Sequence, residues 1–121
     1  MGIRDLFRRR RPRVSADPAD LDHLRRWCRT RVGVEAFLEP ETLVSVPGLC
    51  LVAFDGEWTR RPVGDVATAR RVASQLKLPL FDASVTGYPQ RMREYEEVRI
   101  KRERRERARR LREQMREADE R

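Results

Sequence analysis

Asp55, Gly56 and Glu57 are the residues whose types and spacing most suggest chemistry. They lie in the stretch LVAFDGEWTRRPVGD, residues 51–65. Two carboxylates two residues apart could hold a metal ion. Asp-Gly is also a strong hairpin signal, because tight two-residue turns need residues that tolerate positive φ angles. An aspartate at the apex of a hairpin does not lie on a strand that faces a cleft, as a metal-binding carboxylate would. We therefore predict that Asp55 is a turn residue rather than a metal ligand.

The other reactive side chains are too few to form a familiar catalytic site. His23 is the only histidine, and it precedes Cys28 by five residues. On a helix the two lie about 140° apart around the axis and cannot pair locally. One histidine and two cysteines cannot complete a four-ligand zinc site, and no glycine-rich phosphate loop is present. We predict no catalytic residue, no metal and no cofactor, with Cys28 and Cys50 as free buried thiols in a cytoplasmic protein.

The segment GYPQRMREY, residues 87–95, combines two aromatic residues with arginine at the start of a predicted helix. Its candidate partner-binding residues are Tyr88, Arg91, Met92 and Tyr95. In one interpretation, Tyr88, Met92 and Tyr95 dock the helix on the domain through their i, i+4, i+7 spacing. In the other, the ring faces and the guanidinium stack on a base or on a protein chain.

The excess positive charge lies at the two ends of the chain. Residues 1–14 carry a net charge of +5, residues 15–87 of −1 and residues 88–121 of +4. We therefore expect an anionic partner to bind the ends rather than the middle. No stretch approaches the roughly 18 apolar residues that a membrane span needs.

Arginines follow one side of the predicted C-terminal helix. This stripe consists of Arg102, Arg105, Arg109, Arg112 and Arg116. A solvated helix stabilised by Glu–Arg pairs four residues apart would explain the pattern, and so would a helix that lies on nucleic acid or on a ribosomal surface. A coiled-coil seam is a third possibility, because an apolar strip includes Ala108, Leu111 and Met115.

The N-terminal arm, residues 1–13, also has two interpretations. Its run Arg8, Arg9, Arg10 and Arg11 would bind phosphates as a flexible arm. Alternatively, Ile3, Leu6 and Phe7 would lie on an anionic membrane, with the arginines contacting the headgroups.

The elements that must position these residues follow from periodicity and capping signals. A helix begins after Asp17 with Pro18 at its first position, and a second helix begins after Asp65. The predicted strands are 34–38, a central 48–54 covered on both faces, 57–63 and 78–83. Residues 42–46 form either a weaker strand or an extended loop, and the last helix runs from Gln90 to about Glu120. Alternation in the first strand predicts one wet face.

These elements predict an α+β fold, in the order α-β-β-β-α-β-α. We expect a small antiparallel sheet of three to four strands with two helices on one face, followed by a long charged C-terminal helix. The predicted divisions are a basic arm and linker at 1–17, a small domain at 18–87 and the charged helix at 88–121.

The order of elements resembles two known folds. It is similar to restriction-endonuclease-like cores, whose metal-binding carboxylates would fall on Asp55 and Glu57, but Thr59 stands where those cores carry a lysine. Residues 18–77 resemble a double-stranded-RNA-binding domain. Such domains open their second helix with a lysine cluster, whereas this chain has Gly-Asp-Val-Ala at 64–67.

A closer resemblance is to small uncharacterised actinobacterial proteins. It rests on VEAFLEP, LVAFDGEWTRR and GYPQRMREY and covers about residues 20–96. Some of these proteins carry a loose oxidoreductase label, for which this chain has no cofactor motif. The sequence leads us to expect a non-enzymatic accessory protein that binds RNA or a ribonucleoprotein through its basic ends. The alternatives are a membrane-peripheral or protein-binding adaptor and a small enzyme.

Overall fold

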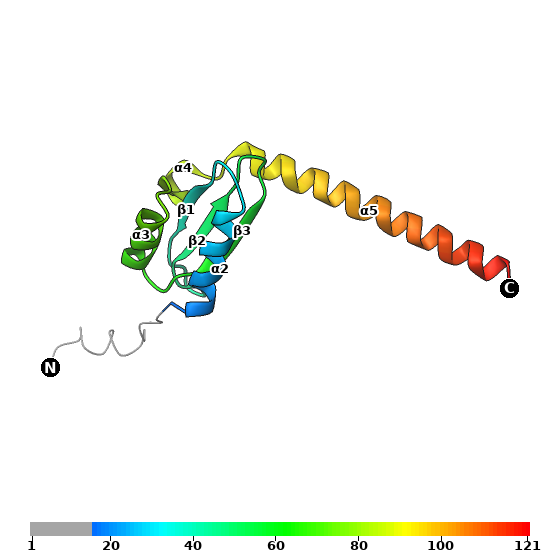
Figure 1. The fold of residues 1–121 in the computed structure, drawn as a ribbon, viewed down its shortest axis with the longest axis horizontal. Coiled ribbons are helices and arrows are strands. Elements are labelled where there is room, and N and C mark those ends of the chain that lie inside the picture. The colour runs from blue at the N-terminus through cyan, green and yellow to red at the C-terminus, as the bar shows by residue number, and fades with distance from the viewer. Residues whose placement is uncertain (1–15) are drawn as a thin grey trace.

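Four strands form one sheet in the computed structural model, which describes residues 16–121. The chain order is α2 (Pro18–Arg29), β1 (Glu35–Glu39), β2 (Gly48–Val52), β3 (Trp58–Pro62), α3 (Val66–Gln75), β4 (Leu80–Asp82), α4 (Ala83–Thr86) and α5 (Gln90–Asp119). The predicted α+β class and the long C-terminal helix are confirmed. Figure 1 shows the sheet with its helices at one end of the molecule and α5 extending away from it.

The sheet is mixed, with the strand order β3-β2-β1-β4. β1 pairs antiparallel with β2, and β2 pairs antiparallel with β3. β4 departs from the expected antiparallel pattern, because it runs parallel to β1, with Ala36 opposite Leu80. The reason is the connection through α3. A helical crossover returns the chain to the end of the sheet where β3 began, so β4 runs in the same direction as β3 and β1.

α2 and α3 cover one face of the sheet, as predicted. Leu24 and Trp27 of α2 and Val72 of α3 are buried there against residues of β1 and β2. Each helix begins at its predicted cap: Asp17 accepts a hydrogen bond from Ala19 N at 2.9 Å, and Asp65 accepts one from Thr68 N at 2.7 Å. Local capping and an apolar stripe are thus enough to place both helices.

The opposite face of the sheet is also covered, which confirms the prediction for the central strand but contradicts the wet face predicted for the first strand. Phe37 of β1, expected on the wet face, is buried together with Cys50 and Val52 of β2. The covering residues are Trp58, Phe81, Ala83, Tyr88 and Met92. α4, Tyr88 and the first turn of α5 therefore form a second layer over this face. The ring of Phe37 is buried there and stacks on Phe81 of β4 with ring centroids 5.5 Å apart.

The turn between β2 and β3 has three residues rather than two. Ala53 N donates to Glu57 O at 2.8 Å, Gly56 N donates to Ala53 O at 3.0 Å, and Gly56 alone within this loop has a positive φ, of 93°. This is the hairpin in which a left-handed glycine follows a tight turn. β2 is buried along its length as predicted. The prediction was wrong for Phe54, which lies at the apex of the turn and is exposed.

One other strand differs from expectation, and an open alternative is decided. The predicted strand 78–83 is shortened to β4, because the side chain of Asp82 accepts hydrogen bonds from Ser84 and begins the short helix α4. Residues 42–46 form a loop, which was one of the two predicted alternatives, and it is closed by a hydrogen bond from Thr42 N to Ser45 O at 2.9 Å.

Candidate nucleic-acid interface

The carboxylates of Asp55 and Glu57 serve the hairpin and its neighbourhood. Asp55 Oδ1 accepts a hydrogen bond from Glu57 N at 3.0 Å, which makes Asp55 the predicted turn residue. Glu57 pairs with Arg31, whose Nη2 and Nε lie 2.8 and 3.2 Å from its two carboxylate oxygens. The guanidinium of Arg31 also lies over the ring of Trp27. Among residues 16–121, no three His, Cys, Asp or Glu side chains come together as metal ligands.

The histidine and the cysteines lie in the packed part of the domain. Burial lowers the pKa of His23, with a further contribution from the positive charge of Arg61, and His23 Nε2 lies 2.7 Å from Thr59 Oγ1. Burial raises the pKa of Cys50 to about 12 and also raises the pKa of Cys28. Both thiols are therefore protonated at neutral pH and poor nucleophiles.

The root of α5, by which we mean Tyr88 and the first turns of the helix up to Glu96, is anchored to the sheet by polar contacts at three points. Tyr88 Oη donates to Glu39, which also pairs with Arg60 at 2.5 Å. Trp58 Nε1 donates to Glu96 Oε1 at 2.9 Å. Burial, together with the hydrogen bond to Glu39, raises the pKa of Tyr88 to about 12. These contacts fix the direction in which α5 leaves the domain.

Arg91 makes the third anchor. Its Nη2 lies 2.5 Å from Glu35 Oε1, and its Nε donates to Ala53 O at 3.0 Å. A Cβ atom on Gly56 would lie only 2.0 Å from Arg91 O and 3.0 Å from Tyr95 Cβ, so the hairpin backbone packs directly on the first turns of α5.

All four residues of the predicted partner patch therefore lie together at this root, and Met92 packs on the buried residues Phe37, Cys50 and Val52. Their contacts within the chain fit the docking interpretation. Binding of a partner by these residues stays a prediction. Sequence reasoning missed Glu35, Glu39 and Arg60, because no local pattern marks residues that pair across 56, 49 and 28 positions of the chain.

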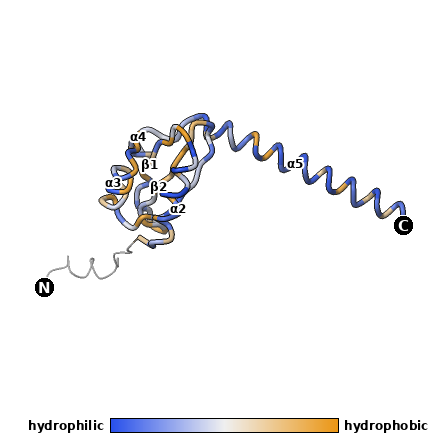
Figure 2. Tube along the Cα trace, in the orientation of Figure 1, coloured by the Kyte–Doolittle hydropathy of each residue, from blue (hydrophilic) through white to orange (hydrophobic). Residues whose placement is uncertain are grey.

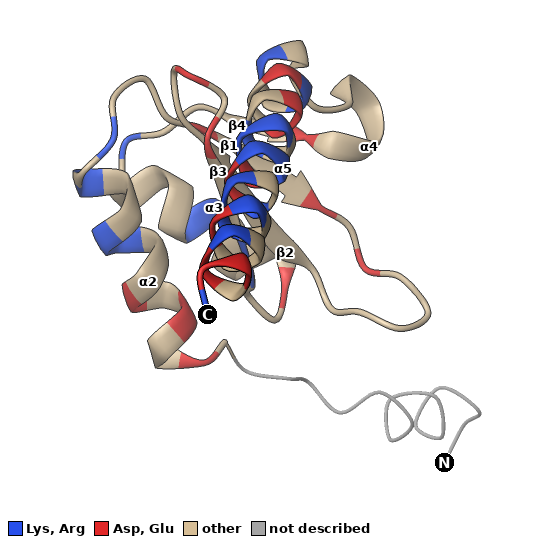
Figure 3. Cartoon of the chain, turned by 90° about the vertical axis from the view of Figure 1, so that its right-hand side faces the viewer, with Lys and Arg blue, Asp and Glu red and all other residues tan. Residues whose placement is uncertain are grey.

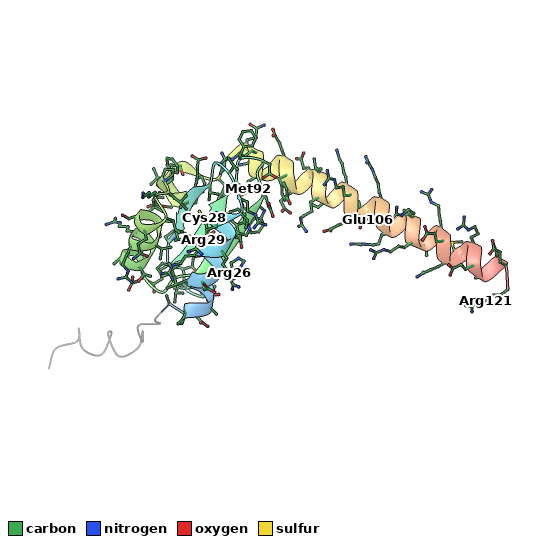
Figure 4. All side chains as sticks on the ribbon, in the orientation of Figure 1. Arg26, Cys28, Arg29, Met92, Glu106 and Arg121 are labelled. Atoms are coloured by element: carbon green, nitrogen blue, oxygen red, sulfur yellow. The ribbon has the colours of Figure 1, made fainter. Side chains whose placement is uncertain are left out.

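Beyond its root, α5 is an exposed arm. Its 30 residues extend about 45 Å at 1.5 Å per residue, and none of them is fully buried. Figure 2 shows the contrast between the apolar segments of the domain and the mostly hydrophilic arm. In Figure 4, Met92 lies at the domain end of α5, whereas Glu106 and Arg121 lie far along the arm.

The arginine stripe lies on this free part of α5. All five residues of the stripe are exposed, and within the described chain none of them makes an ion pair. Residues 102–116 carry eight arginines and three glutamates, a net charge of +5 over about 21 Å of helix. Figure 3, a view along α5 from its C-terminal end, shows basic residues over much of its length. Arg8, Arg9, Arg10 and Arg11 lie outside the described residues.

The ion pairs within α5 centre on Arg99. Its Nη2 lies 2.6 Å from Glu96 Oε2 and its Nη1 lies 2.9 Å from Glu103 Oε1. The Glu–Arg and Glu–Lys pairs expected farther along the helix are not within ion-pair distance in the described chain. The arm therefore keeps most of its positive charge available to a partner.

The stripe continues only the edge of the docked face that carries Arg91 and Tyr95, because Met92 and Glu96, which also contact the domain, lie about 120° and 160° from the centre of the stripe at 100° per residue. At 100° per residue, Arg91 and Tyr95 fall within roughly 60° of the centre of the stripe. The arginines thus lie on the same side of α5 as the hairpin that packs against its root.

Comparison of the chain with protein-family models, curated proteins and solved structures found no match. The resemblances to actinobacterial proteins and to double-stranded-RNA-binding domains stay predictions. Within the described residues, no helix has both the length and the apolar character that crossing a bilayer requires.

Proposed function

We propose that the chain is a non-enzymatic accessory protein that binds RNA or a ribonucleoprotein surface in the cytoplasm. The observation that supports it is the row of five exposed arginines on α5, which make no ion pair within residues 16–121. Arginine binds phosphate through several donors at once. A helix with a net charge of +5 over residues 102–116 binds a polyanion favourably, because binding releases counterions that were condensed on the polyanion.

In this proposal the domain holds the arm, and the arm binds. The polar anchors at the root fix α5 relative to the sheet, so the stripe presents its charges in one direction. The basic residues 8–11, which lie outside the described part, add a second set of phosphate contacts.

Self-association through α5 explains the residues of this helix less well than RNA binding does. A parallel coiled coil built on Ala108, Leu111 and Met115 places Arg107 of one copy beside Arg112 of the other. Like charges at these flanking positions repel. The apolar strip is also short, so the seam has little burial with which to offset that repulsion.

Two triple variants test the proposal. Replacing Arg105, Arg109 and Arg112 by glutamine keeps helix propensity nearly unchanged and removes three charges from the stripe. The matched control replaces Arg104, Arg107 and Arg110, which are also exposed and form no ion pair with any described residue but lie outside the stripe. Arg99 is unsuitable as a control because it pairs with Glu96 and Glu103.

We expect the stripe variant to bind generic RNA more weakly than the unaltered chain. Its slope of log Kd against log salt should be lower by about 2 units, because each phosphate contact that is lost reduces the number of counterions released on binding. The control variant should retain most of the affinity. Fluorescence anisotropy at several salt concentrations measures both quantities. Equal losses in the two variants would show that only net charge matters, and absence of RNA binding by the whole chain would refute the proposal.

A further inference from the structure

Phe54 is exposed at a fixed position on the hairpin apex. Its side chain is 77% exposed, and the neighbouring Val32 is 80% exposed. The backbone beneath it is held firmly: Phe54 N donates to Val32 O at 2.9 Å, and a Cβ on Gly33 would meet Phe54 Cβ at 3.1 Å. Exposure of a large aromatic ring gains nothing for folding. The ring is therefore available to a ligand without rearrangement of the turn.

A surface cleft of about 600 Å³ adjoins the ring. Arg31, Val32, Asp55 and Glu57 line it together with Phe54. The Arg31 guanidinium is engaged by Glu57 and lies 4.6 Å from the centre of the Trp27 ring. Carboxylates at the rim repel phosphate but accept hydrogen bonds from the amino groups of bases. The cleft thus suits a flat heteroaromatic ring better than a phosphate.

The hairpin that lines the cleft contacts the edge of α5 from which the arginine stripe continues. The hairpin that carries Phe54 packs through Gly56 on Arg91 and Tyr95, and these two residues belong to the face of α5 that continues into the stripe. Arg102 follows Tyr95 by about 10 Å along the helix axis. A strand whose phosphates follow the arginines can therefore reach the cleft at the root of α5.

We propose that Phe54 is a stacking platform for an unpaired base of single-stranded RNA whose phosphates lie along the arginine stripe. Proteins that bind single strands combine a basic track for the backbone with aromatic side chains for the bases. In a duplex, both faces of each internal base are already stacked on neighbouring bases, so Phe54 cannot stack on them and the arginines contact the phosphates alone. The platform therefore selects single strands. This inference rests on the proposed function and names the class of RNA.

The test compares two probes on the whole chain: an unstructured 12-nucleotide RNA and a 12-base-pair RNA duplex. The variants are Phe54→Leu, which keeps an apolar side chain without a ring face, and Phe54→Trp, which restores one. Leu43→Ser is the matched control, because Leu43 is 97% exposed on the loop at the other end of β2. Thermal unfolding checks that each variant is folded.

We expect Phe54→Leu to weaken single-strand binding about 5- to 150-fold, the range for loss of one stacked base. The salt slope should not change, because no phosphate contact is lost. Phe54→Trp and Leu43→Ser should bind as the unaltered chain does, and duplex binding should be the same in all four proteins.

Unchanged single-strand affinity in Phe54→Leu, which is also the result if Phe54 docks a protein instead, would overturn the platform while leaving the proposed function intact. Equal losses for single strand and duplex would overturn it as well. If the unaltered chain binds neither probe, the platform and the proposed function fail together.

Discussion

Leu51 and Leu111 are the same residue type, but their side chains have different environments in the two regions of the molecule. Leu51 of β2 is fully buried between two layers, whereas Leu111 of α5 is 57% exposed. The domain is held together by burial on both faces of its sheet. The arm is held in shape by its own helical hydrogen bonds and by the Arg99 ion pairs. Because packing does not constrain the arm, its surface can be given over to charge.

Truncating each leucine measures this contrast most directly. Leu51→Ala should lower the free energy of unfolding by about 3–4 kcal/mol, through lost burial and the cavity that remains. Leu111→Ala should change it by less than about 0.5 kcal/mol, because alanine forms helix well and little apolar area is lost. Urea unfolding followed by tryptophan fluorescence gives both values. Similar losses would mean that α5 packs on something in solution.

Two glycines probe the junction between the regions. Gly56→Ala should cost about 2–4 kcal/mol, because its Cβ would overlap the backbone of Arg91 and because its φ is positive. Gly87→Ala is the control, since Gly87 also has a positive φ but nothing lies within 4 Å of its Cβ position. It should cost only about 1 kcal/mol. If the Gly56 variant is as stable as the Gly87 variant, the hairpin does not pack closely on α5.

The smallest expected effect concerns pH and is confined to the domain. Burial and the charge of Arg61 lower the pKa of His23 in the folded chain, so the unfolded chain binds more protons near pH 6. Stability from this group is complete above the unfolded pKa of roughly 6.5 and is lost as pH falls through the lower folded value.

His23→Gln should therefore flatten the dependence of the unfolding free energy on pH between about 7.5 and 5. The Arg105, Arg109 and Arg112 triple variant should keep that dependence, because the arm contains no histidine. A pH dependence that persists in His23→Gln would assign it to other groups.

Signals within a few residues predicted much of the fold. Asp17 and Asp65 mark the helix starts, Asp55-Gly56 marks the hairpin, and uninterrupted helix formers mark α5. What the sequence missed depends on distant contacts. Phe37 is buried only because the root of α5 covers it, and β4 is parallel only because α3 crosses over.

The same division applies to the candidate site. The arginine stripe follows from helical periodicity alone, so the sequence is enough to predict it. The cleft at Phe54 is different, because Phe54 continues an apolar run that is typical of a buried strand. Only the three-residue turn shows that this ring lies at the apex.

The parallel pairing of β4 with β1 also sets the order in which the molecule can assemble. During synthesis, the strands up to β3 can pair as successive hairpins, but one edge of β1 stays open until Leu80 arrives to pair with Ala36. An open edge is a template for pairing with other chains. Two of the three anchors of α5 are on β1, at Glu35 and Glu39. Because α5 also follows β4 in the chain, the arm takes its fixed direction only after the strand that closes this edge has been made.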